Sequence, residues 1–408
     1  MKITIAKEEL IRGLQSVQNV VNPRTTLPVL SNVLLVAEEG KLVLTATDLD
    51  VTVSCTVLAD VQETGKITLP AKKIFGIVRE LSTPEIELNV DEKNVCSLHA
   101  GASFFKIVGL SANEFPPIAT FEEKNKISIS QECLRGMLRK TSYAVSSEES
   151  RYVLNGIYFS IKEFKLIMVA TDGRRLALVE QDLEETPDVQ VNFIVPTKAI
   201  NEMNRLLGEE GTVDVQFQDN QASFYLRGES EFSILLITKL IEGTYPNYTQ
   251  VIPKKCKERV PLVREELLQA LRRAEIMTSD KAHSVKFAFT QNNLQITANT
   301  PDVGEARENI AVNYSGEDIT VSFNPLYMMD PLKVLEDDEV FLEMSDELSP
   351  GVLKVQTPFI YVIMPMRTNT ASWSKRRQTT ADFRERYLFC INATSYYHND
   401  CIGFFKAD

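Results

Sequence analysis

The sequence has little of the chemistry that enzymes use. Its 408 residues include only three histidines, His99, His283 and His398. None of them lies near a candidate nucleophile, or near a carboxylate at the spacing of metal ligands. The sequence also lacks the Gly-x-x-x-x-Gly-Lys-Ser/Thr phosphate loop and the Gly-x-Gly-x-x-Gly turn. We therefore expect no catalytic residue, no bound metal and no cofactor, and we predict that the chain is not an enzyme.

Long apolar segments are missing as well. No run approaches the roughly 18 apolar residues that a membrane helix needs, and the first ten residues, MKITIAKEEL, lack the apolar core of a signal peptide. The six cysteines show no Cys-x-x-Cys spacing. Free thiols in a reducing cytoplasm explain them best, with disulfides or zinc as the alternatives. We expect a cytoplasmic protein with no membrane partner.

The overall charge points away from nucleic acid. Lys and Arg number 44 against 56 Asp and Glu, which gives a net charge of −12. Such a balance disfavours a polyanionic partner if the charges are evenly spread. The hydrophobic content of 44% and charged content of 25% are ordinary for a globular protein. The distribution of the basic residues therefore decides the question.

The best-defined local feature covers residues 151–178. It is typical of two strands joined by a short polar turn at Lys162 to Lys165, and it ends in the turn Thr171-Asp172-Gly173. Asp-Gly is a strong turn signal because Gly accepts positive φ and the Asp side chain bonds its own backbone. A role in this turn explains Asp172 better than a role in catalysis.

Weaker copies of this feature lie on both sides of it. Thr47-Asp48-Leu49 stands upstream in the place of Thr171-Asp172-Gly173, and Thr297-Ala298-Asn299-Thr300 stands downstream. The segments that start at Met1, Lys126 and Arg259 also align with one another. The chain therefore reads as three copies of one domain, each large enough to bury its own core. We place them at 1–121, 122–254 and 255–367, and we treat 368–408 as an atypical C-terminal tail, expected to be poorly ordered.

Each copy follows the order strand, helix, strands, helix, strands, so we predict an α+β fold of three repeated domains. Ser130 is expected to cap the helix that follows it. Pro331 lies inside a helical pattern of the third copy and should kink or shorten that helix.

Basic residues gather on the predicted helices, whereas acidic residues gather in strands and turns. Lys7, Arg12, Arg139, Arg264 and Arg273 are examples of the basic set. Simple solvation explains one basic helix face. Repetition over five helices favours a shared positive surface, whose natural partner is the phosphate backbone of duplex DNA. Such binding would depend on salt and be indifferent to sequence.

The repeats carry motifs that resemble a known family over residues 1–367, the bacterial DNA polymerase III beta subunits, which are sliding clamps. The matching segments are 24–32, 151–156, 170–177, 245–248 and 362–367. The resemblance implies a ring built from two chains joined head to tail, with helices lining the hole and antiparallel sheets outside. Such a ring encircles DNA, slides along it and acts as a polymerase processivity factor. The implied partners are duplex DNA, a second copy of the chain, the DNA polymerase III alpha subunit, the clamp loader and other proteins with clamp-binding motifs.

The same resemblance implies three groups of site residues. The DNA-binding positions are Arg24, Arg151, Tyr152, Lys198 and Arg205. The pocket for partner peptides comprises Leu154, Thr171, Gly173, Arg175, Leu176, Pro246, Val251, Val362, Met364, Pro365 and Met366. The dimer interface comprises Lys73, Ile77, Phe105, Ile107, Ile276 and Met277. Val153 stands where the family often has a second tyrosine, and Gln250 where it often has arginine.

Two hypotheses remain beside this interpretation. One is a repeat-built adaptor that binds proteins without encircling DNA. The other concerns the tail, where Glu385-Arg386-Tyr387-Leu388-Phe389 resembles a Gln-x-x-Leu-Phe clamp-binding peptide with Glu in place of Gln. That segment could bind the pocket of its own chain.

Overall fold

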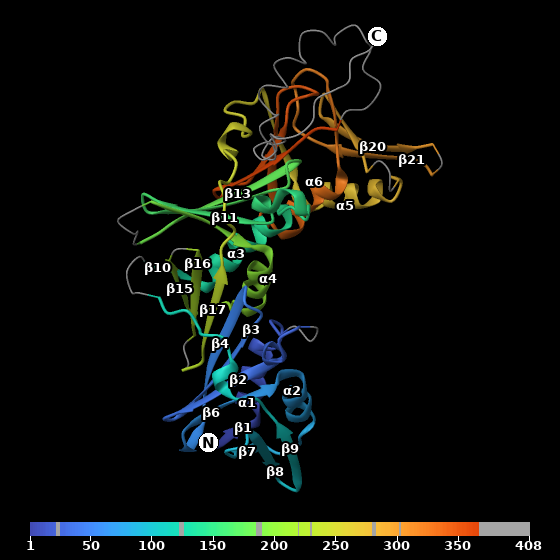
Figure 1. Ribbon diagram of the computed structural model, residues 1–408. Helices are drawn as coiled ribbons and strands as arrows, with labels where there is room; N and C mark the ends of the chain where they lie inside the picture. Colours follow the sequence, from blue (N-terminus) through green and yellow to red (C-terminus); the bar gives the residue numbers. More distant parts are fainter. Residues whose placement is uncertain are drawn as a thin grey trace, which may run out of the picture. The chain divides into compact units, whose positions relative to one another are not determined.

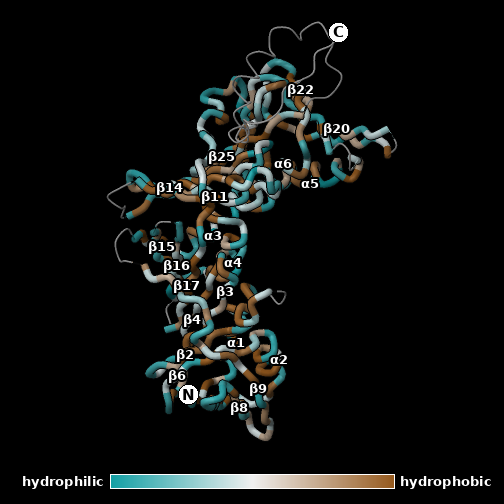
Figure 2. Tube along the Cα trace, viewed as in Figure 1, coloured by the Kyte–Doolittle hydropathy of each residue, from teal (hydrophilic) through white to brown (hydrophobic). Residues whose placement is uncertain are grey.

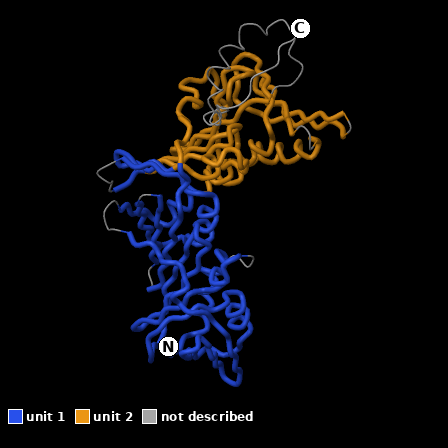
Figure 3. Tube along the Cα trace, in the orientation of Figure 1, with its two compact units in different colours: residues 1–138, 159–166, 182–242 blue, residues 139–158, 167–181, 243–408 orange. Residues whose placement is uncertain are grey.

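The computed structural model describes residues 1–21, 25–121, 126–184, 190–218, 220–228, 231–279, 283–301 and 303–366 (Figure 1). The chain forms two compact units (Figure 3). Unit 1 comprises residues 1–138, 159–166 and 182–242, and unit 2 comprises residues 139–158, 167–181 and 243–408.

Unit 1 contains two antiparallel sheets that follow from the first two sequence copies. The five-stranded sheet has the order β5 (Asp60–Glu63), β1 (Lys2–Ala6), β7 (Glu85–Val90), β8 (Val95–Ala100) and β9 (Ser103–Val108). The eight-stranded sheet has the order β10 (Lys126–Ser130), β15 (Thr212–Gln218), β16 (Gln221–Arg227), β17 (Ser233–Lys239), β4 (Val51–Leu58), β3 (Lys41–Thr47), β2 (Asn32–Glu38) and β6 (Gly65–Pro70). Helices α1 (Lys7–Val17), α2 (Ala71–Glu80) and α4 (Thr197–Leu206) complete the unit, and α1 packs against β4 and α2. Strand β14 (Val191–Pro196) lies beside β11 (Gly156–Lys162).

Unit 2 holds the rest of the second copy and all of the third. Its larger sheet has the order β11, β12 (Lys165–Thr171), β13 (Arg175–Asp182), β25 (Phe359–Ile363), β24 (Gly351–Lys354), β23 (Glu339–Met344) and β18 (Glu258–Val263), and residues 159–166 of β11 and β12 are counted with unit 1. Its smaller sheet has the order β21 (Gly304–Ala311), β20 (Asn293–Thr300), β19 (Val285–Thr290) and β22 (Ile319–Phe323). Helices α5 (Arg264–Glu275) and α6 (Pro325–Val334) pack together, and α3 (Gln131–Thr141) runs from unit 1 into unit 2.

The element order confirms the predicted repeat of strand, helix, strands, helix and strands in all three copies. Consecutive copies are joined by strand pairing. In unit 1, β17 pairs with β4, so that Thr238 lies opposite Val51. In unit 2, β25 pairs with β13, so that Ile363 lies opposite Arg175. Each junction therefore extends a sheet from one copy into the next.

Alternation along the strands places the core. Strand β4 alternates between buried and partly exposed residues, as expected for a strand with one covered face. Figure 2 shows hydrophobic and hydrophilic residues interleaved along the trace. On the helices, residues at helical spacing are buried, such as Leu10 and Leu14 on α1 and Leu267 and Leu271 on α5. These two helices thus pack against strands with one apolar stripe, α1 against β3 and β4 and α5 against β20 and β21.

The first residue of the first helix binds the end of the second helix in every copy. The Lys7 ammonium donates to the carbonyl of Leu81, which follows α2. Arg264 donates from Nη1 to the Leu332 carbonyl of α6 at 2.9 Å. Gln131 does this through its amide, whose Oε1 accepts from the Gly208 N–H at 2.8 Å. A cation at a helix C-terminus satisfies free carbonyls and complements the helix dipole.

Two expectations about helices have different outcomes. Ser130 caps α3 as predicted, because its Oγ accepts from the Cys133 N–H at 3.2 Å. Pro331 was expected to kink or shorten its helix, and the shortening does not occur, since α6 has 10 residues, as many as α2 and α4, while the kink stays a prediction. Asn324 caps this helix by accepting from the Leu326 N–H at 2.9 Å, and Pro325 occupies the first position, which favours proline.

The third copy also departs from the expected turn. Thr297 lies inside β20, which continues to Thr300 before the chain turns. Thr297 therefore aligns with Thr47 and Thr171 in sequence, but it does not begin a turn as they do.

Candidate functional site

The turn Thr171-Asp172-Gly173 is held by its own side chains. The Thr171 hydroxyl donates to the Arg175 carbonyl at 2.6 Å and accepts from the Gly173 N–H at 3.1 Å. The Asp172 Oδ1 accepts from the N–H groups of Arg174 and Arg175, at 2.8 and 3.0 Å. Gly173 has a φ of 82°, in the left-handed region that favours glycine. The expected Asp-Gly turn is confirmed.

The first copy builds the same turn without glycine. Leu49 has a φ of 77°, and its N–H donates to the Thr47 hydroxyl at 3.1 Å. The Asp48 Oδ1 accepts from the N–H groups of Asp50 and Val51. The backbone bonds that follow match as well, because Lys239 N–H donates to the Asp50 carbonyl just as the Met364 N–H donates to that of Arg174, both at 2.9 Å.

The Arg175 guanidinium lies directly beneath the second turn. Its Nε donates to Asp172 Oδ2 at 3.0 Å, its Nη1 to Asp330 Oδ2 at 2.5 Å and its Nη2 to the Tyr143 carbonyl at 2.5 Å. It also stacks 4.3 Å from the centre of the Tyr327 ring. The side chain is only 10% exposed. Burial alone would lower the pKa of Arg175, but nearby Tyr361 and the two carboxylates raise it, so the cation is fixed.

Tyr361 joins this network through a helix carbonyl that Pro331 leaves without a backbone partner. A proline in a helix has no N–H, so the carbonyl four residues earlier loses its partner. Here that carbonyl belongs to Tyr327, and it accepts from the Tyr361 hydroxyl at 2.7 Å. Burial raises the pKa of Tyr361, which keeps the phenol protonated and able to donate.

The residues expected to form the partner pocket all belong to unit 2. Strand pairing sets Leu176 opposite Val362. The buried members are Leu154, Thr171, Leu176, Val251 and Val362, and the partly exposed members are Gly173, Arg175, Pro246, Met364, Pro365 and Met366. A peptide bound at these residues would touch mainly the second group, because the side chains of the first group are buried.

One expected DNA-binding residue, Arg151, contacts this turn, and another, Tyr152, follows it in the chain. Tyr152 is 57% exposed. The Arg151 guanidinium donates from Nη1 to the Asp172 carbonyl at 3.2 Å, and its Nε lies 3.3 Å from Glu148. Arg151 therefore supports the turn and neutralises an acid in addition to any contact with DNA.

The other two described candidates, Lys198 and Arg205, make contacts inside unit 1. The Lys198 ammonium pairs with Asp48 of the first turn. Arg205 donates to the carbonyls of Gln15 at 3.1 Å and Ser16 at 2.6 Å, at the end of α1, and it pairs with Glu202 at 2.7 Å. Their assignment to DNA stays a prediction.

Ion pairing also reduces the expected positive surface. Arg12, Arg139 and Arg273 lie within 4 Å of carboxylates, and Arg264 binds carbonyls. Sequence reasoning placed Arg264 on the outer face of its helix, which is wrong, because its side chain is only 20% exposed. In the part of the chain that the structure describes, helix cations outside the ion pairs include Lys72, Lys73, Lys140 and Arg272.

The expected dimer residues lie at two places. Lys73 and Ile77 are on α2, and Phe105 and Ile107 are on β9, the last strand of its sheet. Ile107 is buried and Phe105 partly exposed. Ile276 follows α5 and is 70% exposed, and Met277 is next to it. The interface itself stays a prediction.

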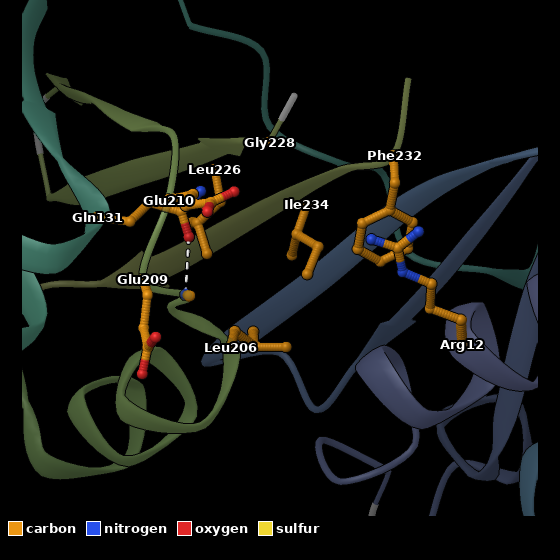
Figure 4. Close-up of a pocket in the computed structure, with 10 residues that line it drawn as sticks. Arg12, Gln131, Leu206, Glu209, Glu210, Leu226, Gly228, Phe232 and Ile234 are labelled. Atoms are coloured by element: carbon orange, nitrogen blue, oxygen red, sulfur yellow. Dashed lines mark hydrogen bonds between the residues drawn. The ribbon is translucent and has the colours of Figure 1, made fainter. Parts of the chain in front are cut away.

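Sequence reasoning missed a pocket of about 540 Å³ in unit 1 (Figure 4). Its lining residues are Arg12, Gln131, Leu206, Gly208, Glu209, Glu210, Leu226, Gly228, Phe232 and Ile234. The Arg12 guanidinium lies 3.6 Å from the centre of the Phe232 ring. The Gln131 amide is engaged with its neighbours. No sequence motif marks this pocket, because its residues come from several separate segments between Arg12 and Ile234.

Metal and thiol chemistry finds little support among the described residues. They hold no group of three or more His, Cys, Asp or Glu residues that could bind a metal ion, and no helix among them could span a bilayer. Burial raises the pKa of both Cys55 and Cys96 to about 12, which makes these thiols unreactive.

Comparison with known protein families finds a match for each of the three copies. Residues 1–119, 128–247 and 249–367 match, in turn, the N-terminal, central and C-terminal domains of the DNA polymerase III beta subunit. The chain belongs to the DNA polymerase III beta subunit family. The match confirms the resemblance inferred from the motifs.

This chain aligns with relatives over nearly the whole length of those relatives. The beta sliding clamp of Chlamydia muridarum is 36% identical over 372 residues, which are 90% of this chain and 99% of that protein. The beta sliding clamp of Vibrio cholerae is 35% identical over 371 residues, which are 90% of this chain and all of that protein.

Solved sliding clamps share the fold. The DNA polymerase sliding clamp of Bacillus subtilis is 29% identical and superposes with a TM-score of 0.85, over 90% of this chain and 99% of that one. The Pseudomonas aeruginosa clamp bound to griselimycin is 35% identical, also with a TM-score of 0.85, over 90% of this chain and 100% of that one. The predicted three-domain α+β clamp fold is therefore confirmed.

Some expectations about the clamp family fall outside the described residues. They are Arg24, the tail 368–408 and the peptide-like segment Glu385-Arg386-Tyr387-Leu388-Phe389 within it. The family match ends at residue 367, so the tail also lies outside that match.

Proposed function

We propose that this chain is a DNA polymerase processivity factor that pairs head to tail with a second copy to encircle duplex DNA. Membership of the sliding-clamp family over residues 1–367 carries this proposal. The ring would hold the polymerase, the clamp loader and other partners on DNA without any chemical step. The work would take place in the cytoplasm.

Two open strand edges support a head-to-tail dimer. Strands β9 and β21 each lie at the end of their sheet order in the described chain. An unpaired edge exposes N–H and C=O groups that can pair with another chain. Strand β9 carries Phe104 and Val108, which are 55% and 72% exposed. Pairing between β9 of one chain and β21 of another would cover such side chains at both ends and close a ring.

The charge distribution suits a ring that slides. Lys72, Lys73 and Arg272 are exposed on helices, whereas the chain as a whole carries −12. A few cations facing phosphates give weak binding that depends on salt and does not read sequence. Retention on DNA would then come from topological linkage and not from affinity. This explains why an acidic protein can work on DNA.

The partner site is proposed at the second turn, with partner peptides lying over its partly exposed members. Met364, Pro365 and Met366 offer an apolar and adaptable surface. A suitable probe is the labelled peptide Gln-Arg-Tyr-Leu-Phe, the tail segment with Gln in place of Glu385. Griselimycin is a second probe, because the Pseudomonas aeruginosa clamp was solved bound to it.

The test is retention on DNA of different topology. The chain is loaded with a clamp loader onto nicked circular DNA, and half of the sample is then linearised. A ring stays on the circle and runs off the free ends of the linear form. Equal retention on both would instead favour the adaptor that binds proteins without encircling DNA. Failure to load on either, together with peptide binding, would also favour the adaptor.

A further inference from the structure

Arg175 was expected to be one of the residues that contact a partner peptide. Its surroundings indicate a different role. All three guanidinium nitrogens donate to groups of this chain, to Asp172, Asp330 and the Tyr143 carbonyl. One face of the guanidinium is covered by Tyr327. Three of its five N–H groups are thus bonded to this chain, and the side chain is only 10% exposed, so Arg175 has little donor capacity left for a ligand.

The partners of Arg175 come from two different copies. Asp172 and Tyr143 belong to the second copy, and Asp330 and Tyr327 belong to helix α6 of the third. The Asp172 carboxylate that accepts from Arg175 through Oδ2 also holds the turn through Oδ1. One guanidinium thus ties the turn of the proposed partner site to a helix of the next domain.

The first junction has no such residue. Val51 occupies the position of Arg175, because Val51 pairs with Thr238 as Arg175 pairs with Ile363. There the turn is tied to the next copy by a direct pair between Asp48 and Lys198. The bridge of two carboxylates through one arginine therefore belongs to the junction at which the partner site is proposed.

We infer that Arg175 is a positioning residue, and that Asp330, which lies outside the proposed site, sets the affinity for partner peptides by holding Arg175. This inference rests on the proposed partner site. A buried fork of charged hydrogen bonds fixes geometry strongly, because the loss of one acceptor leaves a buried cation with only part of its compensation. The turn can then shift by small amounts, and Gly173 with it. Peptide affinity would fall although no group that touches the peptide had changed.

The test compares Asp330→Asn and Arg175→Lys with a matched control, Lys333→Gln. Lys333 pairs with Oδ1 of Asp330 at 3.1 Å, whereas Arg175 binds Oδ2. We expect Asp330→Asn and Arg175→Lys to weaken binding of the probe peptide about tenfold or more, since hydrogen bonds to charged groups are among the stronger ones. Lys333→Gln should bind like the unaltered chain. Retention on circular DNA should be the same for all, which a general loss of folding would not allow.

Amide exchange gives a second readout that needs no peptide. The N–H groups of Gly173, Arg174 and Arg175 are bonded to Thr171 and Asp172, so their exchange reports on the turn. It should accelerate in Asp330→Asn and not in Lys333→Gln. Unchanged exchange, or unchanged peptide affinity in a chain that binds the peptide, would overturn the role of Asp330. If the unaltered chain bound no peptide, the proposed partner site would fail while the exchange result still decided whether Asp330 holds the turn.

Discussion

Leu49 and Gly173 hold the same backbone conformation with very different side chains. Their φ values are 77° and 82°. A residue with a Cβ is strained there, by roughly 1 kcal/mol or more. The bonds of Thr47 and Asp48 hold Leu49 in place despite this strain. The same turn can thus form with leucine in place of glycine when the hydrogen bonds from the Thr and Asp side chains are present.

Alanine at glycine positions tests the strain at this turn. Gly173→Ala should lower the free energy of unfolding by about 1–2 kcal/mol, because φ is positive and the new Cβ would lie 2.8 Å from Arg151 Nη1. Gly76→Ala and Gly136→Ala are the controls. Both glycines lie inside helices, and nothing outside the helix lies within 4 Å of the new Cβ. Each substitution should therefore raise the free energy of unfolding by about 0.5–1 kcal/mol.

Urea unfolding of the four proteins measures these changes. The result that would contradict the argument is an equal effect of alanine at Gly173 and at Gly76. Strain would then play no part in the conformation of the turn.

At the scale of elements, α6 contains a proline that removes a helix hydrogen bond without shortening the helix. Pro331 does remove a helix hydrogen bond, as its chemistry requires. The helix nevertheless keeps its length, because Tyr361 from a neighbouring strand donates to the carbonyl that Pro331 leaves free. Tyr361 lies 30 residues further along the chain, where no local pattern reveals it.

Other parts of the fold were visible in the sequence. Hydrophobic spacing and turn chemistry act over a few residues, so they predicted the three copies, the Ser130 cap and the turn at Gly173. Long-range partners were not visible. The contact of Arg205 with Ser16 joins residues 189 positions apart, and that of Arg264 with Leu332 joins residues 68 apart. Both arginines were therefore read as exposed cations, because their acceptors are backbone carbonyls that carry no sequence signal.

A double-mutant cycle tests the pairing of Pro331 with Tyr361. Tyr361→Phe should lower the free energy of unfolding by about 1–3 kcal/mol, since it leaves the Tyr327 carbonyl without a donor. In a Pro331→Ala background the new N–H can bond that carbonyl, so the same substitution should cost about 1 kcal/mol less. The measurement is chemical unfolding of the four proteins.

Tyr314→Phe is the matched control for this cycle. The Tyr314 hydroxyl donates to the Glu317 carbonyl and has no part in α6. Its loss should cost the same with and without Pro331. An equal cost of Tyr361→Phe in both backgrounds would refute the explanation of how α6 tolerates its proline.

At the scale of the whole molecule, contacts of basic side chains with the chain itself limit its electrostatic attraction to DNA. Several basic side chains on helices bind carboxylates or helix ends of the chain itself, as Arg205 and Arg264 do. The remaining cations cannot give tight binding to DNA against a net charge of −12. The proposed activity therefore depends on closure of a dimer more than on any single contact with DNA.

Closure can be tested at an exposed apolar residue. Ile276 is 70% exposed in the single chain, so Ile276→Glu should leave the stability of that chain unchanged within about 0.5 kcal/mol. A head-to-tail dimer would bury this residue, and a carboxylate without a partner there would oppose association. Leu58→Glu is the control, because Leu58 is 52% exposed and lies outside the expected interface. We expect a solution mass of twice 46.0 kDa for the unaltered chain and for Leu58→Glu, and a shift toward 46.0 kDa for Ile276→Glu, together with loss of retention on circular DNA. A single-chain mass for the unaltered protein would rule out the closed ring, and a dimer that survives Ile276→Glu would move the interface elsewhere.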